Sequence, residues 1–163
     1  IPLIARQDRT GSGVLRYTHI VFQRVYDAAM LESNSAMSGQ PLRIRLGYQT
    51  KDNMPMYNVM VALHISDYLG RRLVTCFTEY TGDSFQMIPA RGEFICEIPR
   101  LNLTSGRYQI ELGSKVNGVV ADRIVSAGTL DVMEGDFYET GKLPSATVHG
   151  PILLDHHWSV RDV

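Results

Sequence analysis

Tyr57-Asn58-Val59-Met60-Val61-Ala62-Leu63-His64-Ile65-Ser66 is the stretch that decides the fold. Large apolar side chains at every second position, from residue 57 to residue 65, alternate with smaller or more polar ones. A period of two places the first set on one face of a strand and the second set on the other. The same period recurs in residues 42–49, 93–98 and 107–112. These segments predict half-buried antiparallel strands.

Turn residues separate these segments from further strand candidates. Asn117-Gly118, between two apolar runs, is the strongest hairpin signal in the chain. Only residues 26–37 have a pattern that permits a helix, and they lack a clear capping pattern. Many short strands without intervening helices predict an all-β antiparallel β-sandwich of the immunoglobulin-like or jelly-roll type. The further strand candidates are Val14–Val25, Arg72–Phe77, Val119–Val132 and Pro151–Trp158.

Length and composition fit one domain over residues 1–163. Hydrophobic residues make up 44% of the 163 residues and charged residues 20%, an ordinary globular balance. The formal net charge of -1 gives no overall field to attract nucleic acid, so we expect no nucleic-acid partner. No apolar run approaches the roughly 20 residues that a membrane helix needs. Residues 1–13 are polar and are expected to be a lead-in from a linker.

The two cysteines, Cys76 and Cys96, each lie in an apolar strand-like run. A disulfide between facing strands is one possibility. Two buried thiols in a reducing cytoplasm are the interpretation that we favour, since cytoplasmic disulfides are rare. The sequence leaves their redox state open.

Catalytic and cofactor motifs are incomplete in this chain. Gly11-Ser12-Gly13 begins like a dinucleotide fingerprint, but Arg16 occupies the position of the third glycine. Residues 135–142 resemble a phosphate loop with one residue too many, and Leu143 follows where a metal-binding Ser or Thr is needed. No Gly-x-Ser-x-Gly elbow occurs. We therefore expect no cofactor and no enzymatic activity in this chain.

A metal site is also not expected. The histidine-rich segment contains His149, Asp155, His156 and His157. On a strand, adjacent side chains point to opposite faces, so His156 and His157 cannot converge on one ion without a bend. The remaining carboxylates are scattered, and none lies in a recognisable hydrolase motif.

A polar strand face is the best candidate for a binding site. If residues 57–65 and 108–112 share a sheet and turn their apolar faces inward, the opposite faces combine amide, imidazole and small side chains. A sugar ring has apolar C–H patches surrounded by hydroxyl groups, so such a face, with a tyrosine at its rim, suits carbohydrate. The candidate residues are Asn58, Met60, His64, Tyr80, Arg107, Gln109 and Glu111.

The C-terminal segment predicts an isolated strand. Asp131–Lys142 ends in a Gly-Asp-Phe-Tyr turn, and the polar residues 140–150 are long enough to act as a hinge. The apolar run at 151–158 has no neighbouring strand in sequence, so it needs a sheet edge in its own domain or in a second copy. The residues that we expect to carry this strand exchange are Ile152, Leu153, Leu154 and Trp158.

Several pieces of the chain, in order and spacing, resemble one family. They are Gly11-Ser12-Gly13, Ser38–Ile44, Ser66–Gly70, Ile98–Tyr108, Gly135–Tyr138 and Leu153–Trp158. Together they resemble the C-terminal carbohydrate-binding domain of the Wzt-type ATPase subunit of O-antigen polysaccharide ABC exporters. The resemblance covers nearly the whole chain, but no ATPase motif is present, and no sugar-contacting residue can be transferred by motif.

The resemblance implies a non-catalytic β-sandwich attached to an ATPase domain. It implies recognition of the terminal, non-reducing end of a lipid-linked O-antigen polysaccharide, which licenses export. It also implies a homodimer with an exchanged C-terminal strand, a transmembrane subunit as partner, and a cytoplasmic location at the inner face of the bacterial inner membrane. Two alternatives stay open: a glycan-active sandwich enzyme and a purely structural dimerisation module. Which polysaccharide or terminal modification is bound is not fixed by the sequence.

Overall fold

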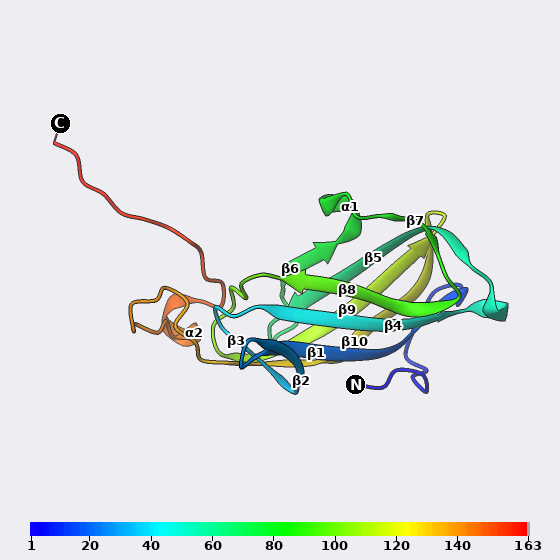
Figure 1. The fold of residues 1–163 in the computed structure, drawn as a ribbon, viewed down its shortest axis with the longest axis horizontal. Coiled ribbons are helices and arrows are strands. Elements are labelled where there is room, and N and C mark those ends of the chain that lie inside the picture. Colours follow the sequence, from blue (N-terminus) through cyan, green and yellow to red (C-terminus); the bar gives the residue numbers. More distant parts are fainter. Residues whose placement is uncertain (163) are drawn as a thin grey trace.

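The computed structural model describes residues 1–162 as two antiparallel layers packed face to face (Figure 1). The smaller sheet has the order β2-β1-β4-β8, and the larger has the order β3-β10-β9-β5-β6, with β7 also paired to β5. The one parallel pair within this described range joins β3 to β10. The strands are β1 (Leu15–Tyr26), β2 (Ala29–Ser33), β3 (Ser35–Met37), β4 (Leu42–Thr50), β5 (Met56–Ser66), β6 (Arg72–Phe77), β7 (Phe85–Ile88), β8 (Arg91–Ile98), β9 (Gly106–Val116) and β10 (Val119–Met133).

The short helical turns lie outside the layers. They are a 3-10 turn, η1 (Lys51–Asn53), and two single-turn helices, α1 (Thr78–Thr81) and α2 (Ala146–His149). None of the helices in the part of the chain that the structure describes has the length and apolar character needed to cross a membrane. The two packed sheets, with helical structure limited to single turns, confirm the predicted all-β sandwich.

The core is built from the alternating residues that the sequence singles out. One face of β4, from Leu42 to Tyr48, is buried against the buried face of β5 and β9. Tyr57 is the exception, because its side chain is largely exposed where we expected burial. Asn58 adopts a φ of 54°, which breaks the extended backbone at this point. The buried alternation therefore starts at Val59 rather than at Tyr57.

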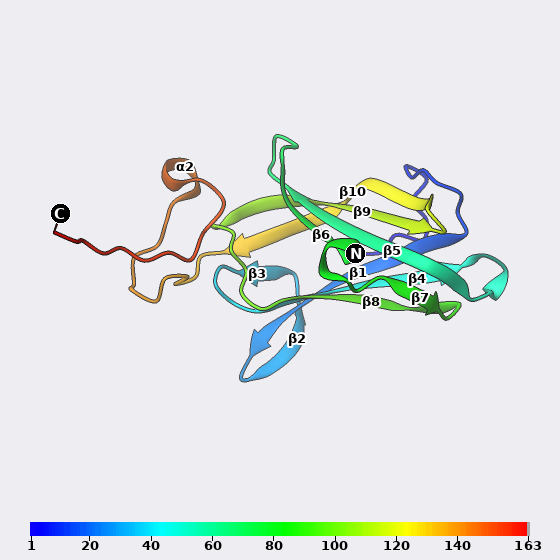
Figure 2. The same cartoon turned by 90° about the horizontal axis from the view of Figure 1, so that it is seen from above.

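The expectation of a helix at residues 26–37 is wrong. Residues 29–33 form β2, which pairs with β1 through a tight turn at Asp27 and Ala28. Both turn residues have positive φ, 47° and 63°, the pattern of a two-residue hairpin turn. Cross-strand pairing outweighs the weak helical pattern here, and the hairpin projects from the sandwich (Figure 2).

The Asn117-Gly118 hairpin is confirmed. These residues have φ values of 52° and 79° and join Val116 to Val119, which face each other as partners in β9 and β10. β9 lies between β10 and β5, so this hairpin forms the centre of the larger sheet.

Residues 1–13 pack onto the sandwich rather than standing off as a lead-in. Leu3 is fully buried, and the amino group of Ile1 donates to the carbonyl of Ile20 at 2.8 Å. Arg9 reaches the carboxylate of Asp122 on β10, and both side chains are buried. Arg9 Nη2 also donates to the carbonyl of Tyr17 on β1 at 3.0 Å, so this buried guanidinium fixes the segment to both sheets.

The segment Pro151–Trp158 does not form a strand within this chain. Ile152 makes a single bridge to Leu103, and Leu153 is buried. The chain then runs away from the sandwich as an extended tail (Figures 1 and 2). Trp158 is 84% exposed, so it does not anchor the tail by burial. Beyond the Ile152–Leu103 bridge, the described residues of the tail pair with no strand of their own domain. Apolar character alone is therefore insufficient to make this segment a strand.

Cys76 and Cys96 are free and half-buried. Cys76 lies on β6 and Cys96 on β8, the edge strands of opposite sheets, and both line a cavity of about 770 Å³ at this open edge of the sandwich. Apolar core residues line much of this cavity, among them Leu63 and Phe94.

Candidate functional site

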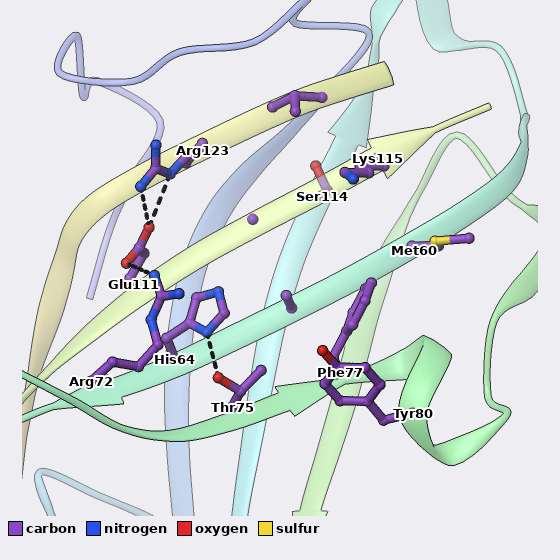
Figure 3. Close-up of a pocket in the computed structure, with 13 residues that line it drawn as sticks. Met60, His64, Arg72, Thr75, Phe77, Tyr80, Glu111, Ser114, Lys115 and Arg123 are labelled. Atoms are coloured by element: carbon purple, nitrogen blue, oxygen red, sulfur yellow. Dashed lines mark hydrogen bonds and ion pairs between the residues drawn. The ribbon is translucent and has the colours of Figure 1, made fainter. Parts of the chain in front are cut away.

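A groove of about 310 Å³ lies on the outer face of the larger sheet (Figure 3). It combines charged, aromatic and small side chains from β5, β6, β9 and β10, together with α1. This mixture makes the groove the candidate site, although the cavity between β6 and β8 is larger. Its lining residues are Met60, Ala62, His64, Arg72, Thr75, Phe77, Tyr80, Glu111, Gly113, Ser114, Lys115, Val120 and Arg123.

The floor of the groove consists of residues with little or no side chain. Ala62 on β5 and Gly113 on β9 are directly paired across the sheet. A Cβ atom added to Gly113 would meet no heavy atom within 4 Å, so the space above this strand is open. Larger side chains flank the pair along both strands, among them Met60 and His64. A small pair between larger neighbours produces a depression that a ligand can enter.

The charged end of the groove is centred on Glu111. Arg72 on β6 donates from Nη2 to Glu111 Oε2 at 2.8 Å, and Arg123 on β10 donates from Nε to Oε1 at 2.9 Å. Burial alone would raise the pKa of Glu111, but the hydrogen bonds from the two arginines hold it below its ordinary value. Glu111 is therefore an ionised carboxylate that orients two guanidinium groups.

His64 lies beside this charged cluster. Its Nδ1 is 2.9 Å from Thr75 Oγ1, across the pairing of β5 with β6. Partial burial, with the positive charges of Arg72 and Arg123 acting in the same direction, lowers the pKa of His64 below its ordinary value. The imidazole is therefore neutral near pH 7, when each ring nitrogen has a distinct donor or acceptor role.

The other end of the groove is aromatic. Phe77 at the end of β6 contacts Tyr80 of α1 edge to face, with ring centroids 5.1 Å apart. Tyr80 remains 75% exposed, so its ring is available to a ligand. Figure 3 shows the two rings at one end of the groove and the arginine–glutamate cluster at the other. The site therefore has an aromatic end, on the side of Met60 and Lys115, and an end formed by the arginine–glutamate cluster.

The sequence identifies part of this lining. Met60, His64, Tyr80 and Glu111 line the groove, as we expected of a binding face. Three other candidates lie outside the groove lining. Asn58 sits at the backbone irregularity near the start of β5, Gln109 lies two positions before Glu111 along β9, and Arg107 pairs with Asp131 at 2.8 Å.

Sequence reasoning missed Arg72, Thr75, Phe77, Lys115 and Arg123. The sequence predicts a strand over Arg72–Phe77 but does not mark Arg72 as a site residue, whereas Arg72 is the first residue of β6 and pairs with Glu111. The alternation of residues 72–77 could have placed it on a strand face. That face meets Glu111 only because β6 and β9 lie on the two sides of β5. Local sequence patterns do not predict this strand order.

The carboxylate of the groove is held by the two arginines. Glycosidases use two carboxyl groups about 5–10 Å apart, one of them held as an acid. Among the described lining residues the one carboxylate is Glu111, and both of its oxygens accept hydrogen bonds from arginine. Within residues 1–162, no group of three or more His, Cys, Asp or Glu side chains is placed to hold a metal ion.

Comparison with known proteins agrees with this architecture. A crystal structure of the C-terminal domain of Wzt superposes with a TM-score of 0.73 at 16% identity, covering 96% of this chain and 90% of that chain. A CARDB domain from Pyrococcus furiosus, solved with di-metal ions, has a TM-score of 0.40 at 10% identity, covering 77% and 100%, a likeness that carries no argument. No curated protein sequence matches the chain. The family model of the Wzt C-terminal domain matches residues 6–149, and the chain therefore belongs to the Wzt C-terminal domain family.

Proposed function

We propose that this domain binds the terminal, non-reducing end of an O-antigen polysaccharide in the groove above Ala62 and Gly113. Family membership supports a role in an ABC exporter. The observation that carries the proposal is the two-ended groove, with the exposed ring of Tyr80 at one end and the Arg72–Glu111–Arg123 cluster at the other. In this proposal the domain recognises a completed chain without altering it, and signals to the attached ATPase domain and the transmembrane subunit at the cytoplasmic face of the inner membrane.

The physical properties of the groove match those of a sugar ring. A pyranose presents an apolar C–H face, which suits the ring of Tyr80, and hydroxyl groups, which suit charged and imidazole partners. Small-molecule sites commonly occupy about 300–1,000 Å³. At about 310 Å³ the groove is at the lower end of this range. It therefore suits one or two sugar residues at a chain end rather than a long stretch of polymer.

Replacing Tyr80 with alanine tests the aromatic end. We expect about a tenfold loss of affinity for the matching polysaccharide, or about 1.4 kcal/mol, because the stacking surface is removed. Isothermal titration calorimetry measures the loss. Tyr68→Ala is the matched control, because Tyr68 is 78% exposed, close to the 75% of Tyr80, and lies outside the groove lining. Equal affinities for the Tyr80 and Tyr68 variants would contradict this role.

We also propose that the C-terminal tail pairs two copies of the chain. Ile152, before the buried Leu153, and Leu154 and Trp158, after it, are exposed. Apolar side chains in an extended tail favour burial against a partner. A second copy offers the sheet edge that the tail lacks in its own domain.

A chain ending after Leu154 tests the exchange while keeping Leu153 in place. Light scattering coupled to size exclusion is expected to give a dimer for the intact chain and a monomer for the shortened one. Thermal unfolding provides the control that the shortened domain still folds. A shortened chain that stays dimeric would exclude the residues after Leu154, Trp158 among them, as the dimer contact.

A further inference from the structure

We propose that the glycan end bound in this groove carries a negative charge, a carboxylate or a phosphate, seated against Arg72 and Arg123. This inference rests on the proposed glycan-binding function and adds the chemical class of the ligand. It starts from the charge of the lining residues. Arg72, Lys115 and Arg123 are permanent cations, and Glu111 is the one carboxylate among the described lining residues. The groove is therefore positive, although the chain as a whole has a net charge of -1.

The relative exposure of these groups decides which charge a ligand meets. The side chain of Glu111 is 12% exposed, whereas those of Arg72 and Arg123 are 48% and 51% exposed. Glu111 therefore lies beneath the two guanidinium groups and contacts them from the sheet side. A ligand that enters from solvent meets the arginines first, so the buried carboxylate orients them and offsets only part of their attraction at the surface.

Hydrogen-bond capacity leads to the same conclusion. A guanidinium group has five N–H donors arranged as a planar fork. Arg72 donates to Glu111 through Nη2, and Arg123 donates to it through Nε and contacts it through Nη2. The other guanidinium N–H groups of both arginines have no hydrogen-bond partner among the described residues. Carboxylate and phosphate oxygens match this fork in charge and geometry, and a neutral hydroxyl group matches it less well.

His64 provides an internal reporter of the bound charge. Its ring lies between the arginine cluster and Thr75, within the same groove (Figure 3). Burial and the charges of Arg72 and Arg123 lower its pKa, and Glu111 acts in the opposite direction. A bound anion adds negative charge beside the imidazole and favours its protonated form. The pKa of His64 therefore rises when an anion binds, and a neutral sugar leaves it unchanged or lowers it further by burial.

Matched sugar pairs test the proposal directly. The probes are methyl α-glucoside with methyl α-glucuronide, and mannose with mannose 6-phosphate, with oligosaccharides of neutral and acidic bacterial glycans as longer ligands. We expect the acidic member of at least one pair to bind at least about tenfold more tightly, with an affinity that falls as salt rises. Nuclear magnetic resonance of the His64 ring is expected to show a raised pKa only with acidic ligands. The two pairs separate carboxylate from phosphate recognition.

Two substitutions are expected to change the affinity for the acidic ligand in opposite directions. Arg72→Gln is expected to lower the affinity for the acidic ligand by about tenfold or more. Glu111→Gln removes the competing carboxylate and is expected to raise that affinity. Arg107→Gln is the matched control, because Arg107 pairs with Asp131 on the same sheet but outside the groove lining.

The outcomes separate this inference from the proposed function. Equal binding of neutral and acidic members, with Tyr80-dependent affinity, would overturn the charge preference and leave glycan recognition in place. Failure of every neutral and acidic glycan to bind would overturn both. An Arg72→Gln variant that folds and binds the acidic ligand as tightly as the unmodified chain would also overturn the assignment of the arginines as the anion contact.

Discussion

Replacing Gly113 with valine is expected to lower glycan affinity by about 100-fold, or about 2.7 kcal/mol, while leaving the fold intact. Gly113 is on the floor of the groove, and a Cβ at this position would meet no protein atom within 4 Å. A valine side chain therefore fits the protein but occupies the space of the ligand. β-Branched residues are favoured in strands and glycine is not, so the melting temperature is expected to stay level or rise.

Calorimetry with the matching polysaccharide, together with thermal unfolding, measures both parts of this prediction. Gln109→Val is the matched control, because Gln109 lies on the same strand but outside the groove lining. We expect it to bind nearly as well as the unmodified chain. If Gly113→Val binds normally, the ligand does not occupy the groove floor. If Gln109→Val loses binding instead, the site extends along β9 toward its start.

The sequence is sufficient for most of the fold because alternation reports burial locally. The buried faces of β4, β5 and β9 follow from the period of two, and Asn117-Gly118 marks the central hairpin. The two errors in the predicted fold, the helix expected at residues 26–37 and the burial expected of Tyr57, have local causes too. Asp27-Ala28 makes a tight turn without the asparagine or glycine that usually marks one. Asn58, with its positive φ, interrupts the alternation of β5, so Tyr57 is exposed while Val59 and the positions after it keep the predicted face.

The site is only half predictable because it depends on which strands are neighbours. Periodicity identifies the outward face of β5 and β9, which supplies His64 and Glu111. Arg72 and Arg123 reach Glu111 from β6 and β10, and their approach depends on the strand order β10-β9-β5-β6. The Asn117-Gly118 turn predicts that β9 and β10 are neighbours, but no local sequence pattern predicts that β9 pairs with β5. The position of the aromatic end is equally hard to predict from local pattern, because Tyr80 lies on a single helical turn, α1, at the end of β6.

Replacing Asp122 with alanine is expected to cost about 3–5 kcal/mol of unfolding free energy, the largest stability effect in this domain. Asp122 accepts hydrogen bonds from Arg9 Nε at 3.0 Å, from Arg9 Nη2 at 2.5 Å and from the backbone N–H of Tyr17 at 2.9 Å. Arg9 and Asp122 are both buried. The alanine variant leaves the Arg9 guanidinium without its counter-charge in the interior. Urea unfolding measures the loss, and the melting temperature is expected to fall by about 10 °C.

A double variant separates the two causes of such a loss. Arg9→Met combined with Asp122→Leu removes both charges, so it is expected to be less destabilising than Asp122→Ala alone. Asp131→Ala is the surface control, because Asp131 pairs with the exposed Arg107 and is expected to change stability by less than about 1 kcal/mol. If Asp122→Ala and Asp131→Ala had equal effects, the buried pair would not hold residues 1–13 to the sandwich. If the double variant is as unstable as Asp122→Ala, the loss of unfolding free energy comes from the unpaired N–H of Tyr17 and from packing. It then does not come from the buried Arg9 guanidinium without its counter-charge.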